Sequence, residues 1–83
     1  MIKLTQESRC LLKKCLEERE PDLIDEIERD YTDNYSDDFY NHLREIVGDE
    51  LIEKGFNEKY EVNEYGILLE KLIDEIGGLF LYK

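Results

Sequence analysis

Residues 63–78 read NEYGILLEKLIDEIGG and carry the widest apolar stripe in the chain. Asn63 is suited to cap the first turn of a helix, and the Gly77-Gly78 pair is suited to end one. The apolar residues between them recur at intervals of three and four, as on one face of an α-helix: Tyr65, Leu68, Leu69, Leu72, Ile73 and Ile76. The segment predicts a helix over residues 64–76 that supplies a large part of the core.

Three further helices are predicted upstream, near residues 6–18, 21–32 and 37–54. Thr5 is a suitable N-cap for the first, and Pro21 suits the first position of the second. Ser36 can cap the third, with Tyr35 and Tyr40 at the spacing of a hydrophobic staple. Gly55 is expected to end that helix in the left-handed conformation.

The connector over residues 56–62 is too short for a pair of strands, so the predicted fold class is all-α. We expect one helical domain over residues 1–83, a small four-helix bundle with an apolar C-terminal tail. The tail reads LFLYK and is expected to pack on the bundle or against a partner. The predicted core comprises Leu12, Leu16, Ile27, Leu43, Val47, Leu51, Leu69, Leu72 and Ile76.

The charge of the chain is strongly negative and unevenly distributed. Its 22 acidic and 11 basic residues give a formal net charge of −11 among 83 residues. Residues 16–38 alone carry −9, whereas residues 1–15 carry +3. This balance argues against direct binding to nucleic acid or to an anionic membrane, and it favours a basic protein as partner.

The sequence offers no support for catalysis, for a cofactor or for a metal site. His42 is the only histidine, and its place beside the apolar stripe is typical of a half-buried structural residue. The acids between the second and third helices do not match a calcium loop, because the sixth position counted from Asp30 holds Tyr35 instead of glycine. No glycine-rich phosphate loop is present.

The two cysteines are expected to be free thiols. Cys10 and Cys15 are five residues apart in a predicted helix, so their side chains point in different directions and their Cα atoms lie beyond the reach of a disulfide. The first nine residues lack the apolar stretch of a signal peptide, and no apolar run approaches the length of a membrane span. Free thiols and the missing signal favour a cytoplasmic location.

Acidic residues and tyrosines alternate around the end of the second helix and the start of the third. Carboxylates steer a basic partner, and tyrosines supply stiff contact area at low entropy cost. We therefore interpret this stretch as a partner-binding surface; the competing interpretation is a solvated face with at least two of the tyrosines in the core. The candidate residues are Glu26, Asp30, Tyr31, Asp33, Tyr35, Asp37, Asp38 and Tyr40.

The C-terminal half resembles small immunity proteins of bacterial polymorphic and contact-dependent toxin systems. The resemblance rests on LREIVGDELIEKGF at residues 43–56, on Tyr60, on NEYG at residues 63–66 and on LEKLID at residues 69–74. In size, acidity and helix count the chain is also similar to the four-helix immunity proteins of nuclease colicins, but it lacks their paired tyrosines followed by proline. No residue role is therefore transferred from that family.

The resemblance implies a cytoplasmic inhibitor that covers the active or substrate-binding surface of a basic toxin, with a nuclease as the favoured toxin. We expect the chain to be a monomer or weak homodimer. Two other functions compatible with the sequence are a DNA-mimicking or anti-defence inhibitor and an antitoxin-like regulator that dimerises through its apolar tail. A DNA mimic would be expected to spread its acids along its length. The regulator requires residues 79–81 to be exposed.

Overall fold

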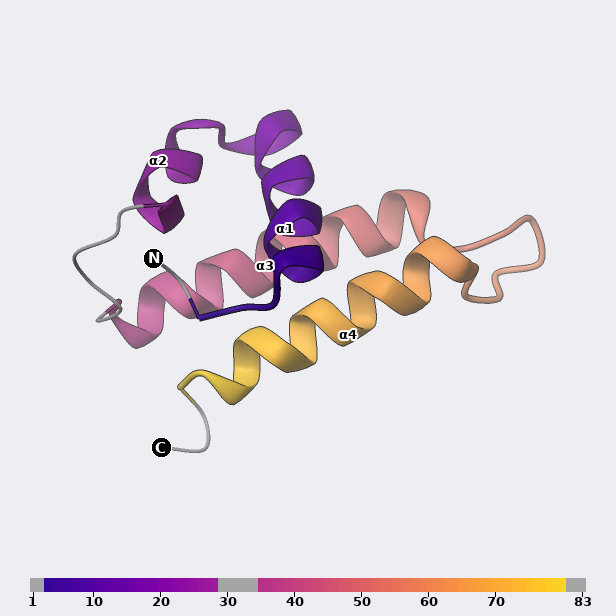
Figure 1. The fold of residues 1–83 in the computed structure, drawn as a ribbon. Coiled ribbons are helices and arrows are strands. Elements are labelled where there is room, and N and C mark those ends of the chain that lie inside the picture. The colour runs from indigo at the N-terminus through magenta and orange to yellow at the C-terminus, as the bar shows by residue number, and fades with distance from the viewer. Residues whose placement is uncertain (1–2, 29–34, 81–83) are drawn as a thin grey trace.

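Four α-helices make up the part of the chain that the computed structural model describes, residues 3–28 and 35–80 (Figure 1). Within these residues the only extended pairing is an isolated antiparallel bridge between Phe56 and Val62. The all-α prediction is therefore confirmed. The helices are α1 (Gln6–Arg19), α2 (Asp22–Glu28), α3 (Asp37–Lys54) and α4 (Glu64–Gly78).

The helices α3 and α4 form a long antiparallel hairpin, and α1 lies across this pair (Figure 1). The short helix α2 packs against α1. Because each helix carries a single apolar stripe, this arrangement lets all four stripes meet in one core. The buried apolar side chains are Leu4, Leu12, Cys15, Leu16, Ile27, Tyr40, Leu43, Ile46, Val47, Leu69, Leu72, Ile76 and Phe80.

The helix starts follow the predicted capping residues. The Thr5 hydroxyl accepts a hydrogen bond from the Ser8 N–H, and Asn63 Oδ1 accepts one from the Gly66 N–H. Ser36 caps α3 in the same way, because its hydroxyl accepts a hydrogen bond from the Phe39 N–H. The second helix begins at Asp22, one residue after Pro21. The part of its predicted span over residues 29–32 lies outside the described residues.

Two predictions at the end of α3 are wrong. Gly55 adopts a right-handed conformation, with φ −88° and ψ −1°, because its N–H still donates to the Leu51 carbonyl in helical fashion. Leu51 itself, predicted in the core, is only half-buried and packs at the core's edge. Eight of the nine predicted core residues are buried, and Leu51 is the exception.

The start of the C-terminal tail packs on the bundle. Phe80 is buried and its ring stacks on Tyr40 with centroids 5.3 Å apart, and Leu79 is half-buried. The final residues, 81–83, lie outside the described part of the chain. Within the described residues no helix combines the length and apolarity needed to cross a membrane.

Candidate protein-binding surface

The predicted acidic surface is only partly described by the structure. Asp37 and Asp38 are exposed in the first turn of α3, where negative charge is favoured by the positive end of the helix dipole. Glu26 is half-buried on α2. Three further candidates from the same stretch, Asp30, Tyr31 and Asp33, lie outside the described residues.

The two described tyrosines of this surface pack inward. Tyr40 is buried in the core between Tyr35 and Phe80, so this candidate partner-binding residue offers almost no exposed contact area. It stands in the N4 position of the staple, which turns it onto the bundle. Tyr35 is half-buried, stacks on Phe39 at 4.8 Å, and its hydroxyl donates to the Glu26 carbonyl over 2.7 Å.

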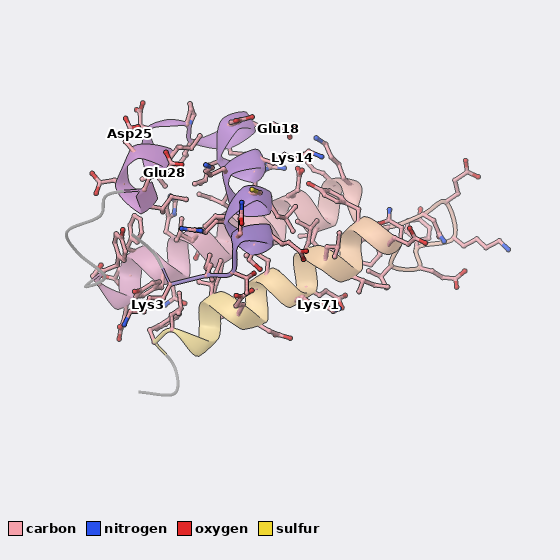
Figure 2. The ribbon with its side chains drawn as sticks, in the orientation of Figure 1. Lys3, Lys14, Glu18, Asp25, Glu28 and Lys71 are labelled. Atoms are coloured by element: carbon pink, nitrogen blue, oxygen red, sulfur yellow. The ribbon has the colours of Figure 1, made fainter. Side chains whose placement is uncertain are left out.

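Acidic side chains also cover α2 itself. Asp25 is exposed and projects outward, whereas Glu28 reaches toward α1, where Lys13 Nζ donates to its carboxylate over 2.5 Å (Figure 2). This hydrogen bond raises the pKa of Lys13 above its usual value. The basic first helix therefore neutralises part of the acidity of α2, while Asp22 and Asp25 are exposed.

A buried carboxylate, Glu50 on α3, joins three helices. Arg19 of α1 donates to Glu50 Oε1 over 3.2 Å, and the Tyr65 hydroxyl of α4 donates to Glu50 Oε2 over 2.6 Å. Lys54 Nζ lies 3.7 Å from the same carboxylate. Burial alone would raise the pKa of Glu50, but these donors and the positive charges outweigh it, so this pKa lies below its usual value.

Cys15 lies in the same buried region. Burial and the nearby Glu50 carboxylate raise the pKa of its thiol to about 11, so the thiol is protonated and unreactive at neutral pH. Both cysteines are free, as predicted, and Cys10 is exposed. Burial and the hydrogen bond to Glu50 also raise the pKa of Tyr65. This contact between three helices, made by Glu50, Arg19 and Tyr65, is named the Glu50 joint.

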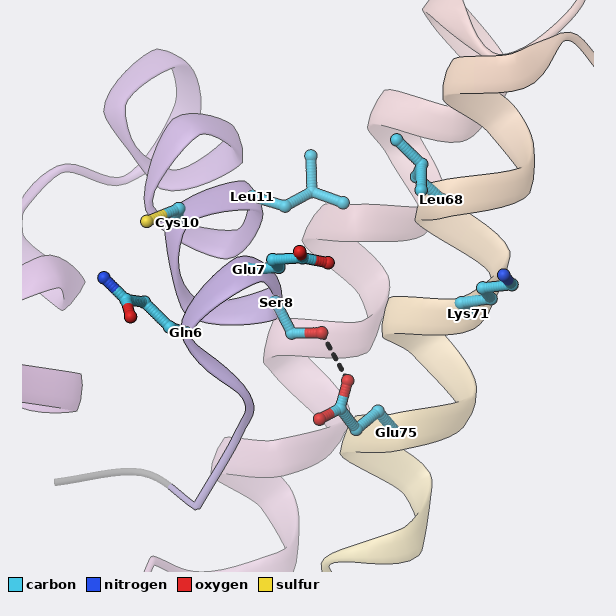
Figure 3. A pocket seen from close by; sticks show the side chains of 8 residues that line it. All are labelled: Gln6, Glu7, Ser8, Cys10, Leu11, Leu68, Lys71 and Glu75. Atoms are coloured by element: carbon cyan, nitrogen blue, oxygen red, sulfur yellow. Dashed lines mark hydrogen bonds between the residues drawn. The ribbon is translucent and has the colours of Figure 1, made fainter.

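A groove of about 620 Å³ runs between α1 and α4 (Figure 3). Leu11 and Leu68 line its apolar part, and Glu75 closes one end. The Glu75 carboxylate accepts hydrogen bonds from the Ser8 hydroxyl and, over 3.0 Å, from the Thr5 N–H. Because Glu75 already caps the positive end of α1, it is engaged in holding α1 on α4.

Other side chains that could bind a metal or take part in catalysis have structural partners. His42 is half-exposed, with Nε2 2.5 Å from a Glu20 carboxylate oxygen, which ties α3 to the end of α1. In residues 3–28 and 35–80, no three histidine, cysteine or acidic side chains gather as a metal site requires.

Compared with protein-family models, with curated proteins and with solved structures, the chain matches none. The residues and their geometry are therefore the basis for a functional proposal.

Proposed function

We propose that this chain is an immunity protein that binds a basic bacterial toxin in the cytoplasm and neutralises it. A nuclease is the favoured toxin, because the substrate-binding surface of a nuclease is basic and would attract this chain. The observation that carries the proposal is the concentration of acidic side chains in residues 16–38, which carry a formal charge of −9. Inhibition is by occlusion, so it requires no catalytic residue.

The described carboxylates support a role in steering. Asp22 and Asp25 on α2 and Asp37 and Asp38 on α3 are all exposed. Charges of one sign gathered on one region raise the rate of encounter with an oppositely charged partner and make that rate sensitive to salt. Tyr35 contributes less contact area than the sequence suggested, since its hydroxyl and ring are engaged with Glu26 and Phe39.

The alternative functions have less support. A DNA mimic would distribute its carboxylates along the molecule, whereas here they are concentrated. A regulator that dimerises through its tail would need Phe80 at the surface, and Phe80 is buried.

Binding kinetics with the product of a neighbouring toxin gene test the proposal. The variant Asp37→Asn/Asp38→Asn should associate roughly threefold more slowly at low salt and lose part of its salt dependence, because exposed charges act chiefly on the association rate. The matched control is Glu70→Gln/Asp74→Asn, which removes two exposed charges from α4. Surface plasmon resonance at two salt concentrations measures both.

Equal association rates and salt slopes for the two double variants would contradict the acidic surface as the docking site. Failure of the parent chain to bind the neighbouring gene product or to restore growth in its presence would contradict the immunity function.

A further inference from the structure

The exposed large apolar side chains of the described residues are confined to one end of the α3–α4 hairpin. They come from the last turn of α3, the connector and the first turns of α4. The connector projects beyond α1 and α2 (Figure 1), whereas Leu68 borders the groove between α1 and α4. Scattered exposed apolar residues are normal, but a group limited to one region indicates an interaction site. We name this group the hairpin-end surface: Ile52, Phe56, Tyr60, Val62, Ile67 and Leu68.

Local geometry brings several of these side chains together. Phe56 and Val62 are directly opposite in an antiparallel bridge, so their side chains point to the same side. Val62 precedes the Asn63 cap and Ile67 follows it by four residues, the spacing at which a hydrophobic staple forms. Ile52 precedes Phe56 by four residues along α3 and its end.

Tyr60 is held outward by a strained backbone. Its φ of 62° lies in the left-handed region, which tyrosine rarely adopts, and its side chain is 89% exposed. No ring of the described residues stacks on it. The fold therefore maintains an unfavourable conformation that leaves an aromatic side chain in solvent, a combination found at binding sites.

The connector is fixed by its own hydrogen bonds. Asn57 Oδ1 accepts from the Lys59 and Glu61 N–H groups at 2.8 and 3.1 Å, and the Tyr60 N–H donates to the Asn57 carbonyl. At its base the Asn63 side chain donates to the Lys54 carbonyl. A surface ordered before binding loses little conformational entropy when a partner docks.

The two ends of the connector are also in close backbone contact. A Cβ added at Gly66 would lie 2.2 Å from the Gly55 carbonyl oxygen, so only glycine fits there. This contact holds the end of α3 against the start of α4, and it adds to the rigidity of the surface between them.

The charges around this surface are mostly negative. Glu58, Glu61 and Glu64 are exposed and form no salt bridge with another described residue, and Lys59 is the one cation among them. Lys54 is already paired with Glu18 at 2.7 Å. A second copy of this chain would bring another formal charge of −11, and an anionic membrane would likewise be repelled.

We infer that the hairpin-end surface binds a cationic segment with an apolar face in a partner protein, with the Tyr60 ring as the anchor. The inference rests on the proposed function for the basic character of the partner, and it adds a second docking surface, separate from the acidic surface of α2 and the start of α3. Carboxylates at the rim meet the cations, and the apolar side chains at the centre are desolvated.

Phage display tests this inference. Random peptides of about 16 residues, long enough for four helical turns, are selected for binding to the intact chain. We expect the enriched peptides to combine lysine or arginine with leucine or aromatic residues. Titrated as free labelled peptides by fluorescence anisotropy, they should bind Tyr60→Asn at least about tenfold more weakly than the parent chain. Asparagine tolerates the left-handed backbone, so the connector is retained.

The matched control is Asp37→Asn/Asp38→Asn, which should change the affinity by less than about twofold because these charges lie outside the hairpin-end surface. Circular dichroism verifies the fold of each variant. If the selected cationic peptides bind the aspartate variant more weakly than the parent chain but bind Tyr60→Asn equally well, the hairpin-end surface is not their binding site. The proposed function would not be contradicted by that result. Enrichment of uncharged or acidic peptides, or of none that bind saturably, would overturn the hairpin-end surface, whereas only failure to bind the neighbouring gene product would overturn the proposed function.

Discussion

The α3–α4 hairpin buries a carboxylate and, ten residues further along the chain, exposes an aromatic ring. Glu50 is fully buried and Tyr60 is 89% exposed, the reverse of what residue type alone favours. Glu50 accepts hydrogen bonds from two other helices, whereas Tyr60 lies on the connector, where no ring of the described residues stacks on it. Both placements cost free energy, and the first is offset inside the molecule.

The contrast between Glu50 and Tyr60 distinguishes a residue that stabilises the fold from a residue that is available for binding. The Glu50 joint fixes the position of α1 on the hairpin, so its disruption should destabilise the fold. The hairpin-end surface makes few internal contacts, so its disruption should leave the fold intact and affect only association.

The largest expected effect comes from the core beneath both regions. Leu69 is fully buried and its neighbour Leu68 is 51% exposed, so the two form a matched pair. Leu69→Ala should lower the free energy of unfolding by about 2–5 kcal/mol because it removes buried methyl groups and leaves a cavity, whereas Leu68→Ala should cost less than about 1 kcal/mol. Urea denaturation measures both, and similar losses would contradict the described packing of α4.

Removal of the buried Glu50 carboxylate is expected to cause the next largest loss of stability. Glu50→Ala should lower the free energy of unfolding by about 3 kcal/mol, because it leaves the Tyr65 hydroxyl without its partner and Arg19 with only the exposed Glu53. Glu53 also pairs with Arg19 but is exposed, so Glu53→Ala should cost less than about 1 kcal/mol. If thermal melts show equal losses, Glu50 does not have the role assigned to it.

The joint should also weaken at alkaline pH. Burial raises the pKa of the Cys15 thiol from its ordinary value of 9.0 to about 11 in the folded chain, so the unfolded state releases its proton first as pH rises. The contribution of this thiol to stability is therefore fully present below about pH 9 and declines toward pH 11, by up to about 3 kcal/mol. Cys15→Ala should remove part of this decline in urea titrations at several pH values, and a decline of unchanged size would exclude the thiol as a cause.

The smallest effect is expected at the exposed ring. Tyr60→Asn should change the free energy of unfolding by no more than about 0.5 kcal/mol, because the side chain is in solvent and asparagine accepts a positive φ. A loss of several kcal/mol in the same denaturation assay would mean that Tyr60 stabilises the fold.

Local signals were enough to predict where the helices begin. Thr5, Ser36 and Asn63 each act within their own first turn, so their capping role can be inferred without knowledge of the rest of the fold. The apolar stripes also gave most of the core, because spacing alone places a residue on a helix face.

The features that depend on distant partners could not be predicted. Glu50 lies four residues after Ile46 and so falls in the apolar stripe of α3, which was the available signal. Its burial requires Arg19 and Tyr65, which are 31 and 15 residues away. Tyr40 was assigned to the candidate site because its sequence neighbours are acidic, but its packing on Phe80, forty residues later, places it in the core.

The central claim is that the Glu50 joint stabilises the fold and the hairpin-end surface binds the partner. An amide NMR titration of the intact chain with one of the selected cationic peptides tests it most directly. The account predicts saturable shift changes concentrated in residues 52–68, with little change around Arg19 and Glu50. Shift changes concentrated in α2 and the first turn of α3, or spread evenly over the four helices, would contradict it.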